Sequence, residues 1–79
     1  MTIRVRLFAA YREVVGAGEL ELPAQAGMTV GAVWQSLVTR HPALAGQAPA
    51  AALNARLVEA DTPLDAGDEL AFLPPVSGG

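Results

Sequence analysis

A chain of 79 residues, 52% of them apolar, can bury one small hydrophobic core but not two. Its formal net charge is −3. A nucleic-acid backbone is therefore a disfavoured partner, since the five basic residues are scattered along the chain: Arg4, Arg6, Arg12, Arg40 and Arg56.

The absence of two residue types narrows the chemistry further. Without cysteine, the chain can have no disulfide, thiolate metal ligand, persulfide or thiol nucleophile. Without lysine, only its α-amino group could accept another protein in a conjugate, which disfavours self-polymerising conjugation. No stretch approaches the roughly 20 apolar residues that cross a bilayer, and the start of the sequence lacks a signal-peptide pattern. We therefore expect a cytoplasmic location.

The first strands are predicted from alternation of apolar and polar side chains. Residues 2–8 alternate, which is typical of a half-buried strand. One face of this strand consists of Ile3, Val5 and Leu7, and the other of Arg4, Arg6 and Phe8. Residues 19–22 alternate in the same way, and their outward side chains, Glu19 and Glu21, are natural cross-strand partners for the arginines.

Two helices are predicted. Tyr11, Val14 and Val15 recur at near-helical spacing, so residues 9–15 favour a short helix that Gly16 is placed to end. Thr29 has the character of an N-cap before the main helix. The apolar stripe of that helix consists of Val30, Val33, Trp34, Leu37 and Val38. Arg40 and His41 suit its last turn, and Pro42 prevents its continuation.

The rest of the chain predicts three more strands. Residues 43–50 indicate an irregular connection with room for one helical turn. Residues 51–53 and 57–59 favour a hairpin around Asn54-Ala55-Arg56, and residues 61–68 are rich in turn residues. Residues 69–73 predict a last strand, with Leu70 and Phe72 on one face and Leu73 on the other. The order ββαβββ predicts an α+β fold in which one main helix packs on a mixed sheet.

The side chains offer little for catalysis. His41, the one histidine, is explained by its place at a helix end, and Trp34 by its place in the apolar stripe. The chain end is the better candidate, because Gly78 and Gly79 follow the rigid pair Pro74-Pro75. Paired glycines make a narrow segment that another protein can enclose. We therefore expect a folded domain over residues 1–75 and a flexible tail over residues 76–79.

Four segments resemble one known family: Leu7-Phe8-Ala9-Ala10-Tyr11-Arg12-Glu13, Thr29-Val30, Asp61-Thr62-Pro63-Leu64, and the closing run from Gly67 to Gly79. The whole chain is similar to the small, sulfur-carrying subunit of molybdopterin synthase. This resemblance implies the ubiquitin-like β-grasp fold, in agreement with the order of elements predicted above. The closing run is its most specific part.

The resemblance also implies a mechanism. An ATP-dependent adenylating enzyme would activate Gly79, and a sulfurtransferase step would leave a terminal thiocarboxylate. The tail would then insert into the large catalytic subunit, within a heterotetramer, and give its sulfur to cyclic pyranopterin monophosphate, with two carriers used per molybdopterin. No resident cofactor or metal is implied, ATP being used by the activating enzyme, and the small subunit is not an enzyme on its own.

A partner-binding surface is implied too. It comprises Phe8, Leu57, Leu73 and Val76, with Arg12 as the residue that matches the family's arginine. The hairpin turn departs from the family pattern, which often has glycine after the asparagine. Three alternatives stay open: a sulfur carrier for thiamine or another thio-compound, a ubiquitin-like protein modifier joined through Gly79, and a plain binding module that uses its apolar sheet face.

Overall fold

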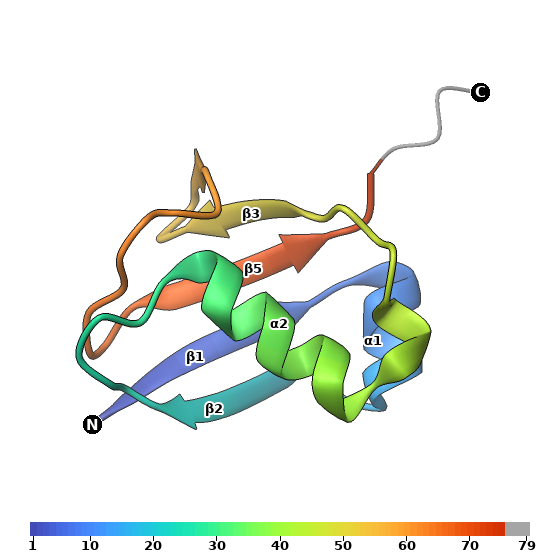
Figure 1. Ribbon diagram of the computed structural model, residues 1–79, viewed down its shortest axis with the longest axis horizontal. Coiled ribbons are helices and arrows are strands. Elements are labelled where there is room, and N and C mark those ends of the chain that lie inside the picture. The colour runs from blue at the N-terminus through green and yellow to red at the C-terminus, as the bar shows by residue number, and fades with distance from the viewer. Residues whose placement is uncertain (76–79) are drawn as a thin grey trace.

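The computed structural model describes residues 1–75 and contains one five-stranded sheet (Figure 1). The strand order across the sheet is β2-β1-β5-β3-β4. In chain order the elements are β1 (Thr2–Leu7), α1 (Ala9–Val15), β2 (Glu19–Pro23), α2 (Val30–Arg40), the 3-10 helix η1 (Pro42–Leu44), β3 (Ala50–Leu53), β4 (Arg56–Val58) and β5 (Glu69–Leu73). The predicted ββαβββ order is confirmed.

β5 is the last strand in the sequence and the central one in the sheet. It pairs in parallel with β1, Leu7 opposite Phe72, and in antiparallel fashion with β3, Ala51 opposite Phe72. β1 also pairs with β2, and β3 with β4, in antiparallel fashion. The sheet is therefore mixed, as predicted, and this topology is the ubiquitin-like β-grasp.

α2 lies across one face of the sheet and buries the core against it (Figure 1). Both the strand alternation and the helical stripe predicted from the sequence point into this core. Its buried residues are Ile3, Val5, Leu7, Tyr11, Val30, Val33, Trp34, Leu37, Leu44, Ala51, Leu64, Leu70 and Phe72. Trp34 packs between two other aromatic rings, with its ring centroid 5.1 Å from that of Tyr11 and 4.9 Å from that of Phe72.

Local signals account for the ends of the helices. Thr29 Oγ1 accepts a hydrogen bond from the Ala32 N–H at 3.2 Å, which confirms the N-cap of α2. Gly16 ends α1 in the left-handed conformation, with φ of 84°, as predicted. Gly31 serves a close approach, because its N–H donates to the Ala60 carbonyl at 2.8 Å and a Cβ there would lie 3.2 Å from that oxygen.

Three details differ from the sequence prediction. Val14 has the helical spacing of Tyr11 and Val15 but is 40% exposed, since the short α1 buries only Tyr11 fully. Arg56 belongs to β4, so the hairpin turn has two residues, Asn54 and Ala55, both at positive φ. Ala50 begins β3, one residue earlier than predicted, whereas the helical turn expected in this connection is present as η1, which buries Leu44. Within residues 1–75, no helix is both long enough and apolar enough to cross a membrane.

Candidate docking face and chain end

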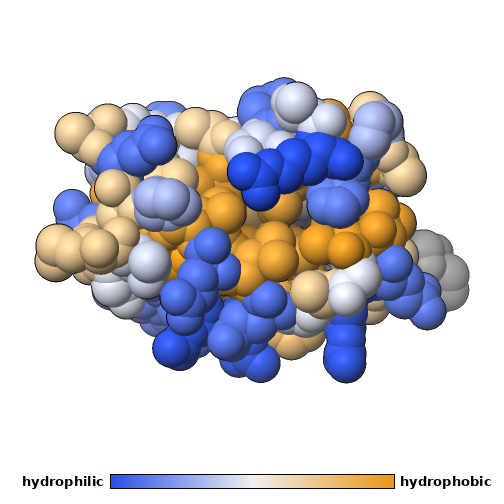
Figure 2. Space-filling model, turned by 90° about the horizontal axis from the view of Figure 1, so that it is seen from below, coloured by the Kyte–Doolittle hydropathy of each residue, from blue (hydrophilic) through white to orange (hydrophobic). Residues whose placement is uncertain are grey.

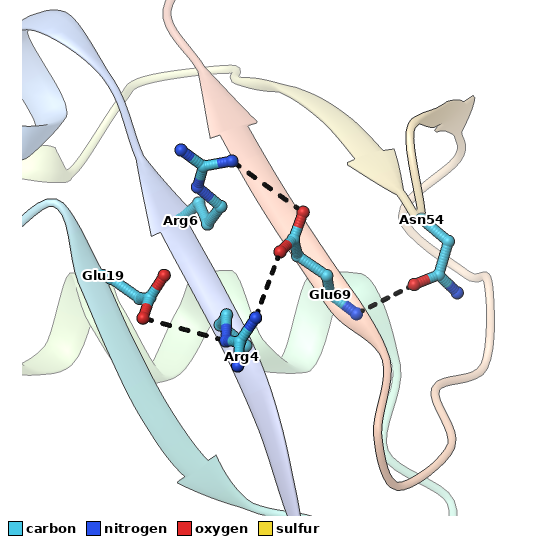
Figure 3. Close-up of polar contacts among 5 residues, drawn as sticks. All are labelled: Arg4, Arg6, Glu19, Asn54 and Glu69. Atoms are coloured by element: carbon cyan, nitrogen blue, oxygen red, sulfur yellow. Dashed lines mark hydrogen bonds and ion pairs between the residues drawn. The ribbon is translucent and has the colours of Figure 1, made fainter.

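The face of the sheet opposite α2 is open, and its β1–β2 half is charged (Figure 3). Arg4 forms ion pairs with Glu19 at 3.7 Å and with Glu69 at 3.6 Å, and Arg6 reaches Glu69 at 4.0 Å. The pairing with Glu19 agrees with the predicted cross-strand contact, whereas Glu69 comes from β5. These pairs are solvent-exposed, so they favour one register more than they stabilise the fold.

The other half of the open face is apolar. The strand register aligns Arg6 with Ala71, Ala71 with Ala52, and Ala52 with Leu57 in one row across the sheet. In the next row Leu73 lies opposite Ala50, and Phe8 directly follows the end of β1 beside it. This apolar half thus has a floor of alanines bordered by larger side chains; we call it the alanine-floored patch, consisting of Phe8, Ala50, Ala52, Leu57, Ala71 and Leu73.

The sequence-predicted residues fall on this patch in different ways. Leu57 is 79% exposed, whereas Phe8 and Leu73 are half-buried. Phe8 also has the Arg6 guanidinium 5.3 Å from its ring centroid, a distance suited to a cation–π contact. The structure therefore places Phe8, Leu57 and Leu73 on one face, with Arg6 at the boundary between its two halves.

The other predicted residues lie elsewhere. Arg12 is on α1, and its side chain lies along Gly18, where an added Cβ would be 3.3 Å from Arg12 Nε. Val76, Gly78 and Gly79 lie outside the described residues. β5 leads the chain toward them from the edge of the alanine-floored patch, through Pro74 and Pro75.

Sequence reasoning missed the floor of this patch. Ala50, Ala52 and Ala71 are small and have no periodic signal of their own, and only the pairing of β3 with β5 brings them together. It also missed Glu69, which binds both arginines across the β1–β5 pairing. Parallel pairing of the first and last strands would have predicted that contact.

Two grooves border α2 in the described part of the chain, and apolar residues form much of their lining. One of about 550 Å³ lies between α2 and the β3–β4 hairpin, beside Trp34 and Val58, and another of about 410 Å³ lies between α2 and β2, beside Leu22 and Met28. Figure 2 shows apolar side chains reaching the surface in a band on the side of β2. Within residues 1–75, no three His, Asp or Glu side chains gather as a metal site.

One buried polar group belongs to the core. The Tyr11 hydroxyl is buried and, within the described part of the chain, has no hydrogen-bond partner. Burial raises the pKa of Tyr11 above its ordinary value of about 10, because the phenolate is poorly solvated there. Because Tyr11 belongs to the buried core, we expect this hydroxyl to affect stability and not recognition.

A mixed sheet under one helix, an apolar patch on the open face and a last strand leading to two glycines define a ubiquitin-like β-grasp protein. The model of the ThiS family matches residues 5–79. The molybdopterin synthase sulfur carrier subunit of Escherichia coli (strain K12) is 42% identical, over 98% of this chain and 99% of that protein. The chain belongs to the ThiS family.

Several solved structures are similar as well. The small archaeal modifier protein 1 of Haloferax volcanii is 30% identical, with a TM-score of 0.82 over 95% of this chain and 98% of that one. A chain from the complex of subunits 1 and 2 of the molybdopterin-converting factor of Helicobacter pylori 26695 is 27% identical, with a TM-score of 0.67 over the full length of both chains. The expectation of a carrier subunit agrees with these relatives, which include a sulfur carrier and a two-subunit complex.

Proposed function

We propose that this chain is the sulfur carrier subunit of a molybdopterin synthase and that the carboxylate of Gly79 is its working group. The position of β5 is the observation on which the proposal depends. This strand is held on both sides by β1 and β3, and it ends at Leu73 on the alanine-floored patch. The residues after Pro75 therefore start from a fixed point beside a surface on which a partner can dock.

The chemistry of a carboxylate explains why activation is needed. An α-carboxyl group has a pKa of about 3.5, so at neutral pH it is an anion that resists attack by a sulfur nucleophile. An adenylating enzyme overcomes this when a carboxylate oxygen attacks the α-phosphorus of ATP and pyrophosphate leaves. A sulfurtransferase then supplies sulfur that displaces AMP, leaving the Gly79 thiocarboxylate. The chain binds no cofactor of its own in this scheme.

The next step takes place in the large subunit, which holds the catalytic residues. Phe8, Leu57 and Leu73 border a shallow alanine floor, so an apolar side chain of that subunit can approach the sheet closely. Val76, which lies outside the described residues, and Arg12 on α1 are proposed as further contacts with that subunit. From Pro74 the chain can reach about 20 Å at full extension, enough to enter a pocket of the partner.

Inside that pocket, Gly78 and Gly79 have no side chains to obstruct enclosure. The thiocarboxylate sulfur is transferred to cyclic pyranopterin monophosphate, and two carriers are used for each molybdopterin dithiolene. Because the sequence has no cysteine, no side chain can hold the sulfur as a persulfide.

A ubiquitin-like protein modifier is the second candidate, favoured by the full-length similarity to an archaeal modifier. It would use the same activated Gly79 but transfer it to an amine of a target protein. A sulfur carrier for thiamine or another thio-compound would share the thiocarboxylate and differ only in the acceptor of the sulfur.

Intact mass spectrometry tests the proposal. The chain is incubated with an adenylating enzyme of the molybdopterin pathway, ATP and a sulfur donor, and its mass is expected to rise by the exchange of one oxygen for sulfur. A matched variant with one residue appended after Gly79 should fold and dock normally but keep its mass. Unchanged mass of the wild-type chain, or equal sulfur gain in the extended variant, would refute the mechanism.

Conjugates separate the two candidates. In a cell extract with ATP, a modifier would form adducts of higher mass that disappear when Gly79 is deleted. A carrier is expected to show the thiocarboxylate without such adducts.

A further inference from the structure

β2 is an edge strand, and within residues 1–75 no other strand pairs with its outer edge. At one end of the β1–β2 ladder the Ala24 N–H donates to the Met1 carbonyl at 3.0 Å. The backbone polar groups of an antiparallel strand point to alternate sides from one residue to the next, so those of Glu19 and Glu21 point away from β1. The outer edge of β2 is therefore a row of unused backbone donors and acceptors.

The groove of about 410 Å³ between α2 and β2 lies beside this edge. On the side of the helix it is lined by the exposed positions Ala32, Ser36 and Arg40, which recur every fourth residue and form one stripe along α2. On the other side it is lined by the half-buried Leu22 and Met28. Figure 2 shows the apolar band on this side of the molecule, bordered by hydrophilic side chains. The side chains of an added strand could enter the groove against the small Ala32 and Ser36.

The charges beside the edge differ between the two faces of the sheet. Glu19 and Glu21 are exposed on the open face, and Glu21 forms no ion pair within residues 1–75, although it lies opposite Arg4. The charged residue that lines the groove is Arg40. A strand added to β2 would thus meet carboxylates on the open face, where basic side chains are favoured. In the groove it would meet apolar side chains and a cation, which disfavour basic ones.

We propose that β2 and the adjoining groove bind an extended segment of a second protein in which apolar and basic side chains alternate. The segment adds a strand to the sheet, with its apolar side chains in the groove and its basic side chains beside Glu19 and Glu21. A second copy of this chain is a poor occupant, because pairing β2 with β2 sets Glu19 opposite Glu21, and like charges directly opposite are destabilising. The two glutamates therefore exclude self-pairing and select a basic partner.

This surface is distinct from the alanine-floored patch. β1 separates β2 from β5, and the patch lies mainly on β5, β3 and β4. The groove is also on the α2 side of the sheet, whereas the patch is on the opposite face. The bound segment leaves the patch uncovered, and its binding does not depend on Gly79.

A short synthetic peptide in which valine and lysine alternate is the probe. It is titrated into the isotope-labelled full chain while the backbone amide signals are followed by NMR. The signals of Glu19, Glu21 and Met28 are expected to move most, and those of Leu57 and Leu73 to stay in place. A peptide with glutamate in place of lysine should bind roughly tenfold more weakly, because each cross-strand charge pair changes from attractive to repulsive.

Two substitutions test the charge and the groove separately. In Glu21→Lys the preference should reverse, so that the lysine peptide binds roughly tenfold more weakly than to the wild type and the glutamate peptide more tightly. Ser36→Phe should fill the groove and weaken binding of the lysine peptide by about tenfold. Gln35→Phe is the matched control and should bind as the wild type does, since Gln35 is also exposed on α2 but lines the other groove. A thermal melt of each variant confirms that the domain is folded.

Backbone pairing is tested with two peptides, one N-methylated at its lysines and the other at its valines. An added strand turns only one of these sets of amides toward β2, so one peptide should lose binding and the other should keep it. Equal binding of the two would overturn the proposal. It is also overturned if the lysine peptide moves no signal of β2, if Glu21→Lys leaves the preference unchanged, or if Ser36→Phe and Gln35→Phe bind equally.

Discussion

The two faces of the sheet use the same strands but different kinds of residue. Under α2 the strands contribute large apolar side chains such as Val5 and Phe72, which are at most 1% exposed. On the open face the neighbouring positions hold Arg6, Ala71 and Leu73, none of them fully buried. Because successive side chains of a strand alternate, stability and recognition are assigned to residues only one position apart. Substitutions can therefore separate the two properties.

The largest effect on stability is expected from Phe72→Ala. This side chain packs on Trp34, and its loss should cost about 3–5 kcal/mol, enough to unfold much of a small domain. Leu73→Ala, one residue on, should cost about 1 kcal/mol or less, since it points to the open face. Urea denaturation followed by Trp34 fluorescence measures both. Equal losses would show that the two faces are not distinct in stability.

Leu57→Ala should have its effect on docking. Leu57 is 79% exposed, so the free energy of unfolding is expected to change by about 0.5 kcal/mol or less. Affinity for the large subunit should fall by about tenfold or more, as for an apolar anchor at an interface. Titration calorimetry measures the affinity, and Val14→Ala, an exposed apolar residue on α1, is the matched control. Wild-type affinity in Leu57→Ala would show that the alanine-floored patch is not the docking surface.

Tyr11→Phe should stabilise the protein by about 1 kcal/mol, because it removes a buried hydroxyl without a partner in residues 1–75. The effect should also depend on pH. The folded state favours the neutral phenol, since burial raises the pKa of Tyr11 above about 10. The contribution of the neutral phenol to the free energy of unfolding is therefore fully present below pH about 10. It decreases as pH rises above about 10, because the tyrosine of the unfolded chain ionises at a lower pH than the buried one.

The Tyr11→Phe variant should lack that part of the alkaline decrease. Denaturant titrations of both proteins on either side of the tyrosine pKa measure the difference. A Tyr11→Phe protein that is less stable than the wild type would mean that the hydroxyl has a partner that contributes to the fold.

The smallest effect is expected from Ala55→Gly, which concerns the connection between β3 and β4. Ala55 has φ of 70°, a conformation that costs an L residue roughly 1 kcal/mol or more. Glycine removes this strain but adds disorder to the unfolded chain, so a net gain of about 0.5 kcal/mol is expected. Ala32→Gly in α2 is the control and should lose about 1 kcal/mol. A loss in both variants would contradict the strain argument.

Much of the fold follows from local pattern. Alternation at Ile3, Val5 and Leu7 and the helical stripe through Val33 and Leu37 predicted the buried face, since period and burial are linked directly. The caps at Thr29 and Gly16 were predicted for the same reason, because they depend on a few neighbouring residues.

What the sequence did not predict depends on contacts between distant segments. Leu64 is buried, although it lies in a segment predicted only to form turns. Its N–H donates to the Met28 carbonyl at 2.9 Å, and this contact with a distant segment holds it in the core. Asn54 was predicted as a turn residue, but its side chain also joins the hairpin to β5, accepting from the Glu69 N–H and donating to Asp68 at 3.0 Å each. The floor of the docking patch likewise exists only once β3 lies beside β5.

The proposed function requires that a stable domain presents Gly79 as a sulfur-bearing acyl end. Its most direct test measures molybdopterin formed from cyclic pyranopterin monophosphate by the purified large subunit, with the wild-type chain or a chain lacking Gly78 and Gly79, each pre-treated with adenylating enzyme, ATP and sulfur donor. Molybdopterin is expected with the wild type and none with the truncated chain, although the two should dock with similar affinity. Molybdopterin formed in equal amount by the truncated chain would contradict it.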